Sequence, residues 1–348
     1  MQKFNKHIIQ PGETVKSIAN LYGLSEESLK FFHNNHCKVE DSILINFTQQ
    51  KELFLPRTAV VDKNKLVKFG HGNRLIFQPE NSLLKYGTII TIENNKHKNE
   101  IKYDVSVRWI KYESGFHFFE IDRTSNLFLN EEEVNEIADL LAYKTSKVLY
   151  PMQISVDQKG QFNNIENADI FKERWNDVKD EVYKEFEGDI VDEYCRKIEA
   201  VLDEPNSLFI FIKNDYFIRT LFFGIYQKFN QNYQTEMTKT FPVINNAVEP
   251  NYKIEVEIDP LKDDYDLINI VGNGKLHDER RRYDFINGAP FSLIIEDNPV
   301  MNDDGNFRLQ YYLNGKTQLP ESLYLECDIN TEKRKKISVV IAVMTESI

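Results

Sequence analysis

The sequence predicts an α+β protein, with a small βααβ unit at the N-terminus and a larger domain whose curled antiparallel sheet surrounds a helical middle. Apolar and polar residues alternate over 102–121 and in the last third of the chain, whereas residues 168–204 carry apolar residues at 3–4 spacing. Hydrophobic residues make up 41% of the 348, enough for real cores. We expect a first domain at 1–58, a connecting region at 59–86 and an α+β body at 87–348.

The first domain is predicted from local signals. A short strand at 8–9 ends at the turn residues Pro11-Gly12. Thr14 can cap a first helix, because its hydroxyl can accept a free backbone N–H of the first turn. Gly23 is a typical left-handed stop for that helix, and Ser25 can cap a second one. A closing strand then completes a strand–helix–helix–strand unit.

These residues resemble a LysM domain over positions 6–57. The residues that carry the resemblance are Pro11-Gly12-Glu13-Thr14, Ile18-Ala19, Tyr22-Gly23-Leu24-Ser25, Leu29, Asn34 and Leu53-Phe54-Leu55-Pro56. The resemblance implies a βααβ fold. It also implies binding of N-acetylglucosamine-containing glycans, such as peptidoglycan or chitin, in a shallow groove between the first strand–helix loop and the loop before the last strand.

The resemblance places the glycan-binding residues in those two loops. They are Gly12, Glu13 and Thr14 in the first loop and Asn34, Asn35 and Ile43 at the second. The second loop departs from the family, because the usual Pro-Gly-Gln is absent and residues 35–52 form a longer segment. LysM-type domains also serve as protein adaptors in phage tails and contractile injection machines. The sequence therefore leaves both a glycan and a protein partner open.

The first part of the body is predicted to contain two hairpins and a helix. The hairpins join 102–109 to 116–121 through Glu113-Ser114-Gly115, and 152–156 to 162–165. Between them, Asn130 can cap a helix that begins with Glu131-Glu132-Glu133 and continues to Val148. This pattern indicates strands flanking helices.

A helical middle and a strand-rich end follow. Gly188 is expected to break the helices of 168–230, and Pro205 to begin a third helix whose aromatic segment spans 207–229. Strands are predicted at 254–258, 307–313, 323–327 and 337–343, with Asn314-Gly315 in a hairpin loop.

Charge and cysteine content narrow the function classes. The net charge is −12, because residues 1–57 carry +1 and the rest of the chain carries −13. This acidic balance disfavours nucleic-acid binding. The basic cluster Arg280-Arg281-Arg282 lies among acidic neighbours. No apolar run approaches the roughly 20 residues of a membrane helix, so we expect no membrane span. Three cysteines and no visible signal peptide predict cytoplasmic synthesis, with any export through a specialised machine.

No catalytic motif is present, and we expect no cofactor and no metal. His33, His36 and Cys37 are too few for a structural zinc site. The leading hypothesis is a non-enzymatic protein whose LysM-like domain binds glycan or docks to a contractile injection or type VI-like assembly, with the body as an anchor. The alternatives are a cell-wall-targeted effector or hydrolase with an unrecognised catalytic body, and a carrier of an apolar ligand that uses residues 207–229.

Overall fold

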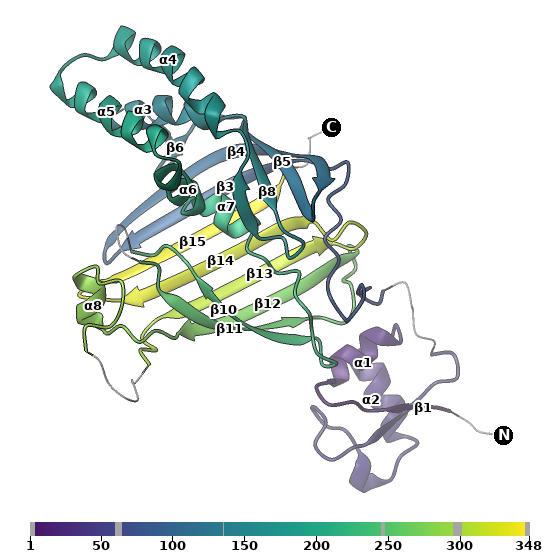
Figure 1. Cartoon of the computed structure of the whole chain (residues 1–348). Helices are drawn as coiled ribbons and strands as arrows, with labels where there is room; N and C mark the ends of the chain where they lie inside the picture. The colour runs from purple at the N-terminus through teal and green to yellow at the C-terminus, as the bar shows by residue number, and fades with distance from the viewer. Residues whose placement is uncertain (1–3, 60–64, 135, 245–247, 295–300, 345–348) are drawn as a thin grey trace.

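The computed structural model describes residues 4–59, 65–134, 136–244, 248–294 and 301–344 (Figure 1). Over these residues the chain is mixed α and β, with eight α-helices and a 13-stranded sheet whose strand pairs are all antiparallel. The predicted α+β class is thereby confirmed. Two hydrophobic clusters share no residue, one drawn from 15–59 and the other from 67–341. Each part therefore has its own core.

The N-terminal unit has the element order strand–helix–helix–strand. Its elements are β1 (Asn5–Ile8), α1 (Val15–Leu21), α2 (Glu26–Asn34), the 3-10 turn Val39–Asp41 and β2 (Glu52–Leu55). β1 pairs with β2 in an antiparallel register that places Asn5 opposite Leu55. The side chains that face inward from the helices and β2 form the smaller core.

Helix boundaries in this unit follow the caps that the sequence predicts. Thr14 Oγ1 accepts from Ser17 N at 3.1 Å, and Ser17 Oγ accepts from Thr14 N at 2.8 Å, which satisfies two otherwise free backbone donors. Ser25 Oγ accepts from Ser28 N at 3.1 Å at the start of α2. Gly23 follows α1 at φ +63°, the left-handed conformation that glycine adopts without strain.

The body is built on the 13-stranded sheet. Its strands are β3 (Leu83–Asn94), β4 (His97–Glu113), β5 (Phe116–Arg123), β6 (Phe128–Leu129), β7 (Glu132–Glu133), β8 (Met152–Val156), β9 (Phe162–Ile165), β10 (Gln234–Thr240), β11 (Asn251–Ile258), β12 (Leu267–Leu276), β13 (Asn306–Asn314), β14 (Pro320–Asn330) and β15 (Arg334–Val343). The main order is β10-β11-β12-β13-β14-β15-β3-β4-β5-β8-β9, with β6 beside β4 and β7 beside β6. β9 and β10 are thus the two ends of this path.

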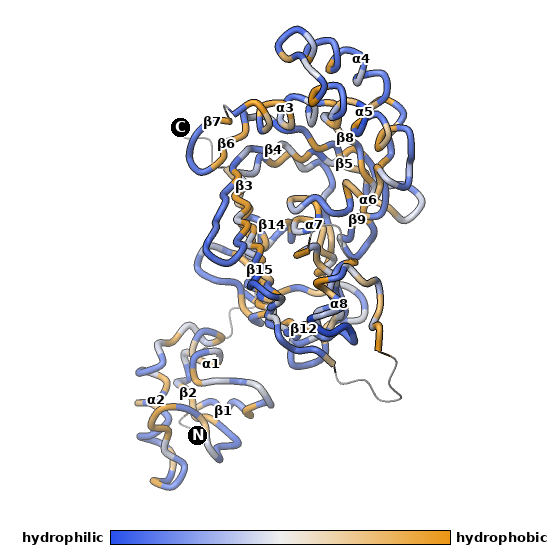
Figure 2. Tube along the Cα trace, turned by 90° about the vertical axis from the view of Figure 1, so that its left-hand side faces the viewer, coloured by the Kyte–Doolittle hydropathy of each residue, from blue (hydrophilic) through white to orange (hydrophobic). Residues whose placement is uncertain are grey.

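Alternation of side chains explains why one face of the sheet is buried. In β13, for example, every second side chain from Phe307 to Leu313 is buried, and Arg308 between the first two is exposed. The predicted hairpins at 102–121, 152–165 and 307–327 are confirmed. Figure 2 shows that the sheet curls, with α7 (Tyr216–Leu221) on its inner side, where α7 contacts β14 and β15.

The remaining helices lie mainly at one end of the sheet. They are α3 (Ile137–Ser146), the 3-10 turn Lys147–Leu149, α4 (Ala168–Glu185), α5 (Asp189–Asp203) and α6 (Pro205–Lys213), whereas α8 (Arg282–Ile286) lies elsewhere (Figure 1). Gly188, at φ +112°, separates α4 from α5, and Pro205 occupies the first turn of α6, both as predicted.

The helix predicted to begin at Glu131 starts later. Asn130 and Glu131 have φ of +53° and +74°, so they form a turn, and Glu132 enters β7. Asn130 Oδ1 accepts from Glu100 N at 2.9 Å on β4. This contact holds the turn beside the sheet and overrides the local helical preference. The helix therefore begins at Ile137.

The prediction of a single aromatic helix over 207–229 is also wrong. α6 ends at Lys213, and Asp215 Oδ1 accepts from Ile218 N at 2.9 Å to cap the new helix α7. α7 ends at Leu221, and Gly224 continues the chain at φ +85°. Residues 222–229 then run as non-helical backbone whose aromatic side chains are buried in the core, where long-range packing decides the conformation.

Part of the predicted connecting region packs on the body. Val67 and Leu75 belong to the larger core. The Gln318 side chain accepts from Ile76 N at 2.7 Å and donates to the Lys68 carbonyl at 2.7 Å, which holds this segment against the loop before β14. Over the described parts of the chain, no helix combines the length and apolarity needed to cross a membrane.

Candidate functional site

The first candidate loop is held by internal hydrogen bonds. Gly12 turns the chain at φ +90°. The Glu13 carboxylate accepts from His7 Nε2 at 2.8 Å and from Gln10 N at 2.7 Å. Partial burial raises the pKa of Glu13, but the hydrogen bonds from His7 and Gln10 outweigh that effect and hold the pKa below its ordinary value. Thr14 acts as the helix cap described above. The polar side chains of this loop therefore have partners within the unit.

At the second loop, Asn34 acts as a clamp. Its Nδ2 donates to the Ile43 carbonyl at 2.9 Å, and its Oδ1 accepts from Ile43 N at 2.8 Å. Ile43 is 2% exposed and belongs to the core. Asn35 is the C-terminal cap of α2, and its N–H bonds to the Phe31 carbonyl at 3.2 Å. The structure thus brings Asn34 and Ile43 together, in contacts that stabilise the loop.

The clamp leaves two apolar side chains on the surface. Leu44 and Ile45, directly after the buried Ile43, are 87% and 84% exposed. Asn46 Oδ1 lies 3.5 Å from Val15 N, at the start of α1, so this loop lies beside the first one. The sequence showed Ile43-Leu44-Ile45 as one apolar run. It gave no sign that the Asn34 amide would bury the first member and expose the other two.

The histidines near the end of α2 are structural. His33 is buried, its Nδ1 accepts from Phe54 N at 3.1 Å, and its Nε2 therefore donates to the Asp41 carbonyl at 3.1 Å. His36 Nδ1 bonds to the Phe32 carbonyl at 2.7 Å. Among the residues that the structure describes, no group of three or more His, Cys, Asp or Glu side chains is placed to hold a metal ion.

The aromatic segment after α7 fills the inside of the curled sheet. An apolar cavity there has a volume of about 20 Å³, which is room for about one water molecule. Its lining residues are Phe77, Ser82, Leu84, Tyr86, Val107, Phe119, Leu221, Phe222, Tyr226, Leu319 and Pro320. A lipid chain does not fit this cavity as it stands.

Comparison with known proteins gives no family assignment. No family model matches the chain, and no curated protein matches it. Among solved structures, a similar one is described as "Lipid-protein interactions in lipovitellin", with a TM-score of 0.39 and 10% identity, covering 77% of this chain and 25% of that chain. This chain therefore spans about a quarter of that protein, and the similarity is too weak to assign a fold family or a ligand.

Proposed function

We propose that the chain is a non-enzymatic adaptor. Its LysM-like N-terminal unit docks to a protein partner in a larger assembly, of the contractile injection or type VI-like kind, through the surface formed by Leu44 and Ile45. The body anchors that unit.

The observation that carries this proposal is the contrast between polar and apolar side chains at the two loops. Glu13, Thr14 and Asn34, which the resemblance assigns to glycan contact, are all bonded within the unit. Leu44 and Ile45 are exposed instead. Exposed aliphatic side chains gathered on a pinned loop are typical of protein contacts, because burying them in an interface removes apolar area from water.

Glycan binding is the second candidate, and the adjacency of the two loops favours it. Asn46 links the second loop to the start of α1, so a sugar chain could contact backbone groups of both loops at once. Apolar sugar faces could also pack on Leu44. Peptidoglycan or a chitin-like glycan is the ligand class that the LysM resemblance implies.

The test compares two variants of the full-length chain. Leu44→Ser/Ile45→Ser removes the exposed apolar pair, and Val39→Ser removes a side chain that is 93% exposed but lies earlier in the same loop, on the 3-10 turn Val39–Asp41. Each variant carries the same site-specific crosslinker at Thr48, an exposed position three residues after Ile45. We expect the wild type and Val39→Ser to crosslink one discrete protein in lysate of the native host, and the double variant to lose that product.

Sedimentation with purified peptidoglycan separates the two candidates. Glycan binding that disappears in the double variant but not in Val39→Ser would overturn protein docking in favour of glycan recognition. Crosslinking that is unchanged in the double variant would refute the assigned surface. Substituting Thr14 or Asn34 is a poorer test, because both side chains hold the loops in place and their loss affects folding.

A further inference from the structure

The two end strands of the curled sheet approach each other, and a cavity lies where they meet. Lys239 Nζ, on β10, donates to Gln161 Oε1, next to β9, at 2.8 Å. Gln161 also forms a bridge with Phe223, after α7. The cavity has a volume of about 410 Å³, within the range of small-molecule sites. Its lining residues are Gln161, Phe162, Phe209, Lys213, Arg219, Phe222, Phe223, Thr238, Lys239, Thr240 and Asn251.

The charged side chains that line this cavity are all basic. Arg219 Nη2 pairs with Glu249 Oε2 at 2.7 Å and donates to the Thr240 carbonyl, so its charge is offset. Within the described ranges, Lys213 and Lys239 take part in no salt bridge. Lys239 contacts a neutral amide and lies 5.5 Å from the centroid of the Phe223 ring. The cavity thus has an excess of positive charge.

The surroundings of Lys239 disfavour its charged form. Burial, with the neighbouring Arg219 and Lys159, lowers the pKa of Lys239 to about 8, and Asp157 opposes this only in part. A partly buried cation without an ion pair destabilises the folded protein. A bound anion at Nζ would supply the missing counter-charge.

One wall of the cavity is aromatic. The rings of Phe162 and Phe209 stack with centroids 5.7 Å apart and planes inclined by 23°. Phe222 and Phe223 are buried beside them. Basic groups and aromatic faces in one cavity suit a ligand that has a charged end and an apolar end.

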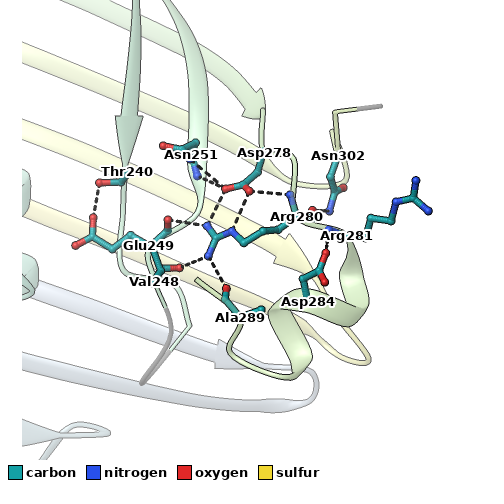
Figure 3. A network of polar contacts seen from close by, with 10 residues as sticks. All are labelled: Thr240, Val248, Glu249, Asn251, Asp278, Arg280, Arg281, Asp284, Ala289 and Asn302. Carbon is teal, nitrogen blue, oxygen red and sulfur yellow. Dashed lines mark hydrogen bonds and ion pairs between the residues drawn. The ribbon is translucent and has the colours of Figure 1, made fainter. Parts of the chain in front are cut away.

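A buried polar network supports two of the lining residues, Thr240 and Asn251 (Figure 3). Arg280, 3% exposed, donates to both Asp278 carboxylate oxygens at 2.9 and 2.8 Å and to the Glu249 carbonyl at 2.9 Å. Asp278 Oδ2 in turn accepts from Asn251, which lines the cavity. The Glu249 side chain bonds Arg219 and Thr240. The network therefore holds Glu249 and Asn251 in position before any ligand arrives.

We propose that this cavity binds a small organic anion, with a carboxylate or phosphate group against Lys239 and Lys213 and an apolar, preferably aromatic, portion against Phe162 and Phe209. This site lies in the body, and it does not depend on the docking surface of the N-terminal unit.

Calorimetric titration of the full-length chain tests the proposal with four probes. Phenyl phosphate and benzoate carry both features of the ligand, benzyl alcohol lacks the charge, and inorganic phosphate lacks the apolar part. We expect the first two to bind and the last two to bind at least tenfold more weakly. Lys239→Gln should weaken binding of the aromatic anions by about tenfold or more, because a charge-assisted hydrogen bond is lost.

The matched control is Lys197→Gln, which removes the same charge from an exposed position on α5 and should leave binding unchanged. Thermal unfolding of each variant shows whether it is folded. The proposal is overturned if neither aromatic anion binds at millimolar concentration. It is also overturned if benzyl alcohol or inorganic phosphate binds as tightly as phenyl phosphate, or if Lys239→Gln and Lys213→Gln, both folded, bind like the wild type.

Discussion

Replacing Lys239 by Met should make the ligand-free protein more stable at pH 7. A pKa of about 8 in place of 10.5 corresponds to about 3 kcal/mol of destabilisation of the charged side chain in the folded state. Remaining solvent contact reduces this value. The Met variant also loses the hydrogen bond to Gln161 and the contact with the Phe223 ring, and each loss costs about 1 kcal/mol of folding stability. We expect a net gain of about 1–2 kcal/mol, or roughly 1–3 °C in Tm for a protein of this size.

The assay is thermal unfolding of wild type and variant from pH 6 to pH 10. The folded-state pKa of Lys239 lies below its unfolded value, so between about pH 8 and 10.5 the unfolded chain binds more protons at this site. The wild type therefore gains stability at this site as the pH rises through that window. The advantage of Lys239→Met should be fully present below pH 8 and should shrink above it.

Two results would refute this reasoning. A destabilised Lys239→Met variant at pH 7 would mean that the lysine contacts outweigh the burial of its charge. A stability difference that stays constant from pH 6 to pH 10 would mean that the side chain titrates normally. Lys197→Met, at an exposed position on α5, is the control and should change stability by less than about 0.5 kcal/mol.

Three further predictions concern the clamp, the buried network and the cavity. Asn34→Ala should destabilise the N-terminal unit by about 2 kcal/mol, seen as faster amide hydrogen exchange at the Ile43 N–H, because both backbone groups of Ile43 lose their partner. Arg280→Met should lower the free energy of unfolding in urea by about 3–5 kcal/mol, because Asp278 would be left buried and unpaired, whereas the exposed Arg108→Met should change it little. Binding of phenyl phosphate should weaken as the pH rises above about 8, measured by calorimetry, because Lys239 loses its charge there.

Local chemistry made the N-terminal elements predictable. The Thr14 and Ser25 caps and the Gly23 stop act through hydrogen bonds and φ angles within a few residues, so their sequence pattern is enough to place α1 and α2. The hairpins of the body were predictable for the same reason, since alternation and turn residues are local. The large antiparallel sheet itself was expected, although its strand order was not.

Elements that depend on distant contacts were missed. The turn at Asn130 is held by β4, and the aromatic residues 222–229 follow the shape of the sheet interior, so in both places helical propensity gave the wrong prediction. β10 and β12 were not predicted. The pairing of β10 with β11 and the position of β10 at the end of the sheet are set by the whole strand order.

In the candidate sites, too, features set by contacts between distant residues could not be read from the sequence. The assignment of ligand contact to the two loops of the N-terminal unit stays a prediction of the resemblance, which could not show that the Asn34 amide bonds the backbone of Ile43. Arg280 looked like one member of a basic cluster, whereas it is a buried partner of Asp278. The cavity could not be predicted from the sequence, because its lining residues come from positions 161 to 251 and meet only when the sheet curls.

The acidic character of the body does not conflict with an anion site. Net charge influences the binding of large polyanions, because their many phosphates interact with charges over a large part of the protein surface. A chain with a net charge of −12 repels such polyanions overall. A small anion in a cavity responds to the groups within a few ångströms, because at physiological salt more distant surface charges are screened beyond about 8 Å. Around this cavity those groups include Lys213 and Lys239, and the charge of Arg219 is already offset by Glu249. An overall negative charge therefore disfavours binding of large polyanions and is compatible with binding of a small anion in this cavity.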